Sequence, residues 1–150
     1  MANEIRLSRR IAASPDEVFD AWTHAEAANQ WLIPAGPGST RAQMDARVGG
    51  RFKIDMTSPD EFIPHHGEYL RVERPSLLEF TWVSPFTDQQ RSVVTVELKA
   101  AGKGQTDLTL THKLLPSAKA VDDHTWGWNA CLDGMVARYA GASTQAPVNA

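Results

Sequence analysis

The feature that most constrains the fold is a helical pattern near the end of the chain, at residues 122–139. Side chains that can pack recur there at steps of four and three residues, which places them on one face of a helix with 3.6 residues per turn. The positions on this face are Val121, Thr125, Trp128, Leu132, Met135 and Tyr139. We interpret this segment as a long helix that a curved antiparallel sheet grips from one side.

A second stripe on the same helix carries only small side chains, at Gly127, Ala130, Cys131 and Gly134. At about 100° per residue, it points roughly a third of a turn away from the first face. Each glycine inside a helix costs about 1 kcal/mol relative to alanine. That cost indicates either a close neighbouring backbone or a helix that walls a space. We therefore predict that the function lies in the gap between helix and sheet.

The chain before this helix is predicted to form one strand, then two short helices, and then a series of antiparallel strands. Residues 4–12 alternate as a strand, with Arg9 on its apolar side. Ser14 and Glu17 form a capping pattern that starts a short helix, and residues 23–26 repeat the pattern for a second one. From residue 40 the period becomes two, and residues 57–65 are predicted to be a loop. The later strands are predicted at residues 51–56, 66–73, 77–83, 92–100 and 105–114. Helices on one face of such an antiparallel sheet define an α+β fold.

Length and composition fit one globular domain, which we place at residues 1–140, followed by a flexible tail at 141–150. The formal charge is −3 and no cluster of Lys and Arg interleaves with aromatic residues, so we expect no nucleic-acid partner. No apolar run is long enough to span a membrane, and no signal peptide is evident. The single cysteine fits a reducing compartment, and we expect a cytoplasmic protein. The sequence leaves a homodimer open.

Four polar residues share strand parity with the buried apolar set: Arg9, His66, Glu68 and His112. A buried charge must be paired, or its pKa shifts. These groups could converge on one polar patch that orients the hydroxyl, carbonyl or carboxylate of a ligand. The alternatives are a bulge that changes the parity or a purely structural His–Glu pair.

The sequence predicts neither a metal nor a cofactor. His65 and His66 are adjacent on a strand and face opposite sides, so both do not readily ligate one ion. The sequence contains no HExxH, CxxC, G-x-S-x-G, P-loop or G-x-G-x-x-G motif. Cys131 lies in the middle of a helix, where a buried thiol is usually an inert packing residue.

Five segments in order resemble a known family. They are VFDAWTHAEAANQWLIP from Val18, MDARVGGRFKIDM from Met44, GEYLRVERPSLLEFTW from Gly67, VTVELKAAGKGQTDLTLTH from Val94 and GWNACLDGM from Gly127. They are similar to bacterial proteins named for resembling the C-terminal domain of the activator of the 90-kDa heat-shock chaperone ATPase. These proteins belong to the START-like (helix-grip, SRPBCC) superfamily. The resemblance covers residues 5–139.

The resemblance implies a curved antiparallel sheet wrapped around the C-terminal helix, with an internal pocket between them. It brings no catalytic motif that could be carried over residue by residue. We expect the pocket to be lined by residues from the strands and the long helix. These candidate ligand-binding residues are Phe52, Ile54, Met56, His66, Glu68, Phe80, Trp82, His112, Trp128, Leu132 and Met135. For any one apolar member, packing in the core is the competing interpretation.

Three functions follow, and we favour the first. It is non-catalytic binding of a small, mostly apolar ligand. The second is a polyketide cyclase- or dehydratase-like enzyme with His66, Glu68 or His112 as acid or base. The third is a chaperone-interacting or stress-response module, which predicts an exposed apolar patch of several hundred Å². The chaperone activator has a further N-terminal domain, so we expect a small ligand before a chaperone as the partner.

Overall fold

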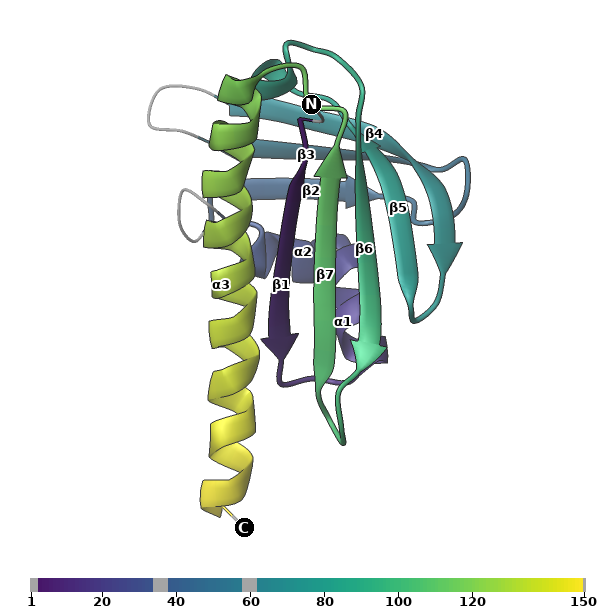
Figure 1. Cartoon of the computed structure of the whole chain (residues 1–150). Coiled ribbons are helices and arrows are strands. Elements are labelled where there is room, and N and C mark those ends of the chain that lie inside the picture. The colour runs from purple at the N-terminus through teal and green to yellow at the C-terminus, as the bar shows by residue number, and fades with distance from the viewer. Residues whose placement is uncertain (1–2, 34–37, 58–61, 150) are drawn as a thin grey trace.

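A computed structural model of the chain describes residues 3–33, 38–57 and 62–149. Within these residues, seven strands form one antiparallel sheet in the order β1-β7-β6-β5-β4-β3-β2, with helices on its concave side (Figure 1). The elements are β1 (Ile5–Ile11), α1 (Pro15–Thr23), α2 (Ala25–Trp31), β2 (Thr40–Met44), β3 (Arg51–Thr57), β4 (Phe62–Glu73), β5 (Leu77–Trp82), the 3-10 turn η1 (Pro85–Thr87), β6 (Ser92–Ala100), β7 (Thr106–Lys113) and α3 (Ala118–Asn149). The predicted α+β helix-grip architecture is confirmed.

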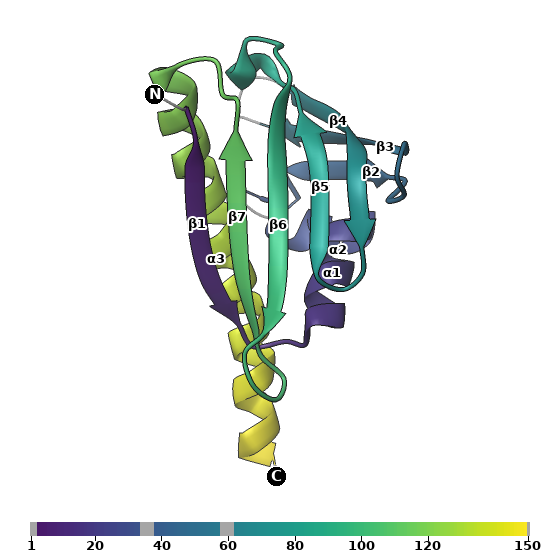
Figure 2. The same cartoon turned by 45° about the vertical axis from the view of Figure 1, so that its right-hand side comes forward.

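The sheet turns sharply along β4. Strands β1, β7 and β6 run along α3, whereas β2 and β3 cross that direction (Figures 1 and 2). The first part of β4 pairs with β3, its second part pairs with β5, and the register with β5 shifts between Tyr69 and Arg71. A Cβ atom at Gly67 would overlap the carbonyl oxygen of Thr81 and the ring of Phe52. Glycine therefore lets the backbones approach where the sheet bends.

The concave face of the sheet forms the core. The alternating positions predicted to point inward on β3, β5, β6 and β7 are buried. They include Phe52, Ile54 and Met56, Leu78, Phe80 and Trp82, Val94, Val96 and Leu98, and Leu108, Leu110 and His112. Leu114, the last residue of the strand predicted at 105–114, is 63% exposed, because β7 ends at Lys113 and Leu114 adopts a positive φ.

Helices α1 and α2 fill one end of the concave face. The capping box at Ser14 is confirmed, because its hydroxyl accepts from the Glu17 amide and the Glu17 carboxylate accepts from the Ser14 amide. The predicted second cap is wrong: α2 begins after His24, and the Thr23 hydroxyl donates to the Phe19 carbonyl instead. Trp22 of α1 packs against Trp31 of α2, with the ring centroids 4.5 Å apart and the ring planes tilted by 60°.

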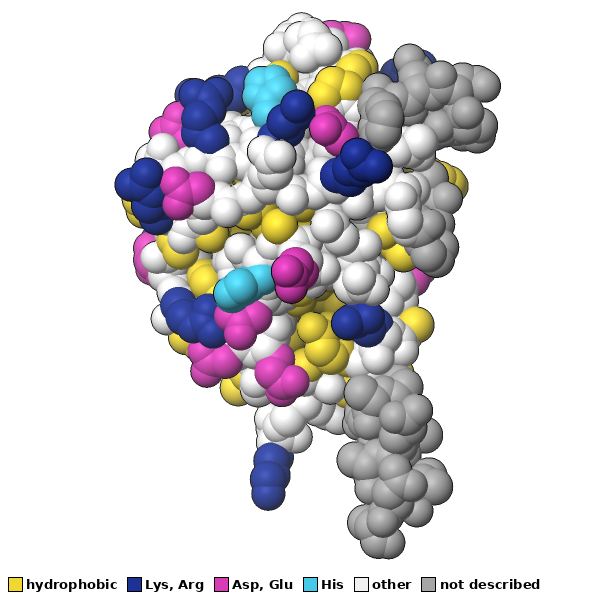
Figure 3. Space-filling view, turned by 180° about the vertical axis from the view of Figure 1, so that it is seen from behind, with side chains coloured by type: hydrophobic (Ala, Val, Ile, Leu, Met, Phe, Trp, Pro, Cys, Tyr) yellow, Lys and Arg dark blue, Asp and Glu magenta, His cyan; other side chains and the backbone are white. Residues whose placement is uncertain are grey.

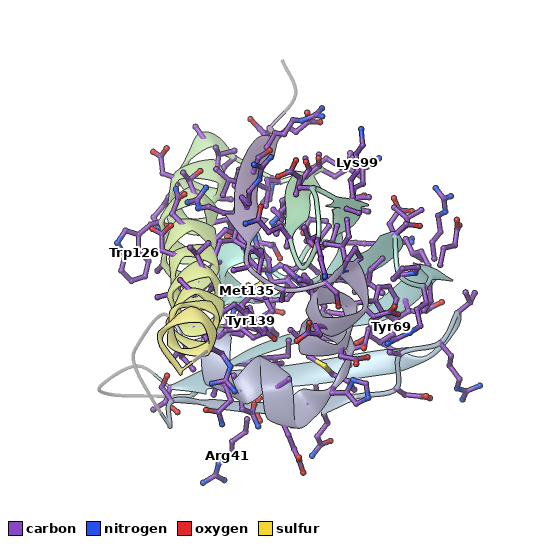
Figure 4. All side chains as sticks on the ribbon, turned by 90° about the horizontal axis from the view of Figure 1, so that it is seen from below. Arg41, Tyr69, Lys99, Trp126, Met135 and Tyr139 are labelled. Carbon is purple, nitrogen blue, oxygen red and sulfur yellow. The ribbon has the colours of Figure 1, made fainter. Side chains whose placement is uncertain are left out.

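Helix α3 lies along the sheet as expected but is longer than expected. Trp128, Leu132 and Met135 of its large face are buried, and Met135 points between α3 and the sheet (Figure 4). The helix starts at Ala118 and runs to Asn149, beyond the predicted bounds of 122–139 and into the segment predicted to be a tail. The loop predicted at 57–65 is wrong in part, since β3 includes Thr57 and β4 starts at Phe62, while residues 58–61 lie outside the described residues.

Candidate functional site

A cavity of about 470 Å³ lies between the first half of α3 and the ends of β3, β4 and β5. Its lining residues are Leu32, Met56, Thr57, Ile63, His65, Trp82, Phe86, Asp122, Asp123, His124, Trp126, Gly127, Trp128 and Cys131. The walls are mostly apolar or aromatic. Phe86 of η1 and Trp126 of α3 are exposed and stand at the rim. The volume is in the range of about 300–1,000 Å³ that is typical of small-molecule sites.

Three predicted site residues, Met56, Trp82 and Trp128, line this cavity. The other apolar candidates are buried in the core that continues from it: Phe52, Ile54, Phe80, Leu132 and Met135. A second void in that core measures only about 20 Å³. The competing interpretation, packing in the core, therefore holds for these deeper residues.

The prediction that His66 and Glu68 face inward is wrong, because both are exposed. Their parity was read from Leu70 and Val72, which lie near or beyond the register shift at Tyr69 and Arg71. Before the shift, the opposite set, including His65 and Gly67, faces the core. Neither His66 nor Glu68 is among the residues that line the cavity.

Arg9 does point toward α3, as predicted. Its guanidinium Nε donates to Asp133 at 2.9 Å, and Nη2 donates to the side-chain oxygen of Asn129 at 2.6 Å. These contacts join β1 to the outer side of α3, and neither Arg9 nor its partners line the cavity. The four predicted polar residues thus do not converge on one patch.

His112 is fully buried behind Trp128 in a complete hydrogen-bond chain. The indole Nε1–H of Trp128 donates to His112 Nδ1 at 3.0 Å, so Nδ1 carries a lone pair and Nε2 carries the proton. Nε2–H then donates to the Ser92 hydroxyl at 2.7 Å, and this hydroxyl donates to the Trp82 carbonyl at 2.6 Å. Burial lowers the pKa of His112 to about 2. The imidazole is a neutral structural group with no free site for acid–base work.

His124 lines the cavity and is incompletely hydrogen-bonded. Its Nδ1 lies 2.7 Å from the carbonyl oxygen of Ala120, which can only accept, so Nδ1 carries the proton. Nε2 is therefore an acceptor, and it is buried without a partner in the described structure. The indole Nε1–H of Trp82, another lining residue, is a buried donor without a partner. A buried polar atom left unpaired costs about 1–3 kcal/mol, which is a reason to look for a bound group.

His65 stands on the opposite wall, packed against Trp82 with ring centroids 5.0 Å apart. Its Nδ1 donates to the Ile63 carbonyl at 3.1 Å. Burial lowers the pKa of His65 to about 4, although the neighbouring carbonyls of Ile63 and Ile54 oppose the shift. Burial also lowers the pKa of His124. Both imidazoles at the cavity are therefore neutral at pH 7.

Sequence reasoning missed His65 and His124, although a signal for the second exists. His124 lies four residues before Trp128, at the same helical spacing that identified the large face. The predicted helix at 122–139 contained His124, but its large face was traced through Thr125 instead. Cys131 was predicted to be an inert buried thiol, and burial raises its pKa to about 12.

Two further observations concern the residues that the structure describes. In residues 3–33, 38–57 and 62–149, no three His, Cys, Asp or Glu side chains form a group that could hold a metal ion. Within the same residues, no helix combines the length and apolar character needed to cross a bilayer.

Comparisons with known proteins agree with the fold. A crystal structure from Chromobacterium violaceum superposes with a TM-score of 0.76 and 24% identity, over 91% of this chain and 96% of that chain. An HSP90 activator from Plasmodium falciparum superposes with a TM-score of 0.73 and 23% identity, over 88% of this chain and 92% of that chain. CalU16 from Micromonospora echinospora superposes with a TM-score of 0.67 and 28% identity, over 88% of this chain and 73% of that chain. No curated protein sequence matches the chain.

The sequence profile of one family covers most of the domain. The profile described as "Activator of Hsp90 ATPase homolog 1-like protein" matches residues 12–140. This span takes in α1, α2, strands β2 to β7, and α3 as far as Ala140. The chain therefore belongs to the Activator of Hsp90 ATPase homolog 1-like protein family.

Proposed function

We propose that the chain binds a small, mostly apolar molecule in the cavity between α3 and the sheet, without converting it. The observation that carries this proposal is the cavity itself, which measures about 470 Å³, whereas a second void in the core measures about 20 Å³. Met56, Trp82 and Trp128 would contact the ligand. The single buried cysteine suits a reducing compartment, so we place this binding in the cytoplasm.

Gly127 supports the proposal. It lines the cavity, and a Cβ atom built on it would meet no atom within 4 Å. The helix therefore has space at this position. The helix glycines were predicted to mark either a close neighbouring backbone or a helix that borders a space, and the second interpretation fits Gly127.

The test uses N-phenyl-1-naphthylamine, a neutral apolar probe whose fluorescence rises in apolar surroundings. The parent protein should bind it. Gly127→Leu should weaken binding about tenfold or more, because the new side chain occupies the cavity. The control is Ala130→Leu, which adds a leucine at an exposed position of the same helix. Probe binding that is equal in both variants, or absent from the parent, would reject the proposal.

A cyclase- or dehydratase-like activity is less well supported. Of its three proposed acid–base residues, two are exposed outside the cavity and His112 is tied into a complete hydrogen-bond chain. Such an enzyme needs a group that can exchange a proton with the substrate. His65 and His124 remain at the cavity, and their burial favours the neutral form.

Interaction with a 90-kDa chaperone is the second candidate, and the family name favours it. Four large apolar side chains are exposed among the described residues: Val48, Phe86, Leu114 and Trp126. On the face shown in Figure 3, charged side chains of both signs are interspersed with small separate hydrophobic areas. A pull-down with the purified chaperone tests this function. Loss of capture in Trp126→Ala would support it, and no capture by the parent would reject it.

A further inference from the structure

The polar groups of the cavity have a consistent charge preference. No lysine or arginine is among the described residues that line it, whereas two aspartates, Asp122 and Asp123, stand at its rim on α3. Asp123 is paired with Lys119 at 2.8 Å. Asp122 is exposed and forms no salt bridge with another residue that the structure describes. The uncompensated charge at the rim is therefore negative.

Neighbouring residues do not reverse this sign. Asp88, which directly follows η1, acts on Lys119, and Asp55 of β3 acts on His65. Lys53 lies 3.7 Å from Asp55 and offsets it. Lysines 53 and 119 are both largely exposed. Among these described residues, the four carboxylates thus outnumber the two ammonium groups, and a carboxylate brought in by a ligand would be repelled.

The interior adds a second, independent feature. His124 is only 7% exposed, it lines the cavity, and its Nε2 is an acceptor without a partner. His124 Nε2 can accept a hydrogen bond from a ligand N–H or O–H group, whereas the unpaired indole Nε1–H of Trp82 can donate to a ligand oxygen. The selection between an amine and a carboxylate therefore comes from the charge at the rim. The surrounding walls are the aromatic faces of Trp82, Trp128, His65 and Phe86. Aromatic faces attract cations and flat rings.

We propose that the cavity selects aromatic molecules whose polar end is an amine, and that it disfavours aromatic carboxylates of the same size. The ring would lie against the indoles of Trp82 and Trp128. The amine would donate to His124 Nε2 or stand near Asp122 at the rim. This inference rests on the proposed function and specifies its ligand class.

Three probes with one skeleton test the inference: the amine 2-(1-naphthyl)ethylamine, the alcohol 2-(1-naphthyl)ethanol and the carboxylate 1-naphthaleneacetate. Their dissociation constants are measured by titration calorimetry at pH 7.5. At low salt, about 20 mM, the amine should bind about tenfold more tightly than the acid, with the alcohol between them. The difference should shrink in about 0.5 M salt, because exposed charges are then screened. An acid that binds as tightly as the amine would overturn the inference.

A pair of variants assigns the effect to the rim. Asp122→Asn should weaken the amine about threefold, strengthen the acid slightly and leave the alcohol unchanged, since only a charge is removed. Glu26→Gln is the matched control, because Glu26 is exposed on α2 and does not line the cavity. An amine-to-acid ratio that is the same in both variants would contradict the role of Asp122.

These measurements distinguish ligand binding in the cavity from the preference for an amine. If neither the three naphthyl compounds nor N-phenyl-1-naphthylamine binds, ligand binding in the cavity is wrong. If N-phenyl-1-naphthylamine binds but the naphthyl amine has no advantage over the acid, only the ligand class is wrong. A bound amine should also shift the ¹⁵N resonance of His124 Nε2, because that nitrogen then accepts a hydrogen bond.

Discussion

The two ends of the protein interior are built by the same sheet and the same helix, yet one is filled and the other is open. In the filled half, Leu132 and Met135 of α3 belong to one hydrophobic cluster with Trp22 of α1 and Trp31 of α2, and a void there measures about 20 Å³. In the open half, His124 and Trp128 of α3 border a cavity of about 470 Å³. Helices α1 and α2 cover only one end of the concave face (Figure 2).

This difference teaches that a helix gripped by a curved sheet does not create a cavity by itself. Trp22 and Trp31 fill the space beneath the sheet wherever α1 and α2 reach. Trp128 stands at the boundary, with ring contacts to Trp22 on one side and to Trp82 on the other. The cavity begins where no third layer supplies side chains.

The largest expected effect is at this boundary. Trp128→Ala should lower the free energy of unfolding by about 3–5 kcal/mol, because a large side chain that is only 4% exposed leaves a cavity. It also removes the donor to His112 Nδ1. Urea unfolding measures the change.

Trp126→Ala is the matched control, since Trp126 is 67% exposed and points away from α3 (Figure 4). We expect a change within about 0.5 kcal/mol. If Trp128→Ala lowered the free energy of unfolding by less than about 1 kcal/mol, Trp128 would not be tightly packed, and it would not separate a filled half from an open half.

Two methionines compare the halves directly. Met135→Ala, in the filled half, should cost about 3 kcal/mol, because the fully buried side chain would leave an enclosed void. Met56→Ala, on the cavity wall, should cost only about 1 kcal/mol, because the space beside it is already open. Equal losses in urea unfolding would mean that the open half is packed as tightly as the filled half.

Acid should weaken the open half through its histidines. In the unfolded chain a histidine has a pKa of about 6.5. In the folded chain, burial lowers the pKa of His65 to about 4 and that of His112 to about 2. The unfolded state therefore binds more protons below pH 6.5. The contribution of each buried histidine to the free energy of unfolding is fully present above that pH and is lost as the pH falls toward 4. At pH 5 the loss is roughly 2 kcal/mol per buried histidine.

Adjacent residues on opposite faces of β4 isolate this effect. His65→Gln should reduce the dependence of the urea midpoint on pH between 7.5 and 5, because one lowered pKa is removed. His66→Gln, at the exposed neighbour, should leave the dependence in place. The reverse result would mean that His66, and not His65, faces the interior.

The sequence predicted the filled half better than the open one. Uninterrupted alternation assigned the inward faces of β3, β5, β6 and β7, and the four-and-three spacing assigned Leu132 and Met135. The alternation failed on β4, because one register shift at Tyr69 and Arg71 exchanged His65 for His66. A bulge of this kind leaves little trace in a single sequence.

The cavity was predicted as a consequence of the fold, but its lining was not. Periodicity tells which way Phe52 or Trp82 faces, and both do face inward. It does not tell how far the opposite layer lies, and that distance decides whether a side chain meets a neighbour or a space. Phe52 is packed in the core and Trp82 lines the cavity for this reason.

The smallest expected effect concerns the two helix glycines, one in each half. Gly127→Ala and Gly134→Ala should each raise the free energy of unfolding by about 0.5–1 kcal/mol, because alanine is the better helix former. At Gly127 a Cβ atom meets nothing within 4 Å, and at Gly134 it meets the Trp31 carbonyl oxygen at 3.7 Å, an ordinary contact. Urea midpoints of the two variants measure the difference, which should stay within about 0.5 kcal/mol. A loss of stability in Gly134→Ala alone would mean that α2 presses on α3 more closely than this distance allows, and the filled half would then owe its glycine to close packing.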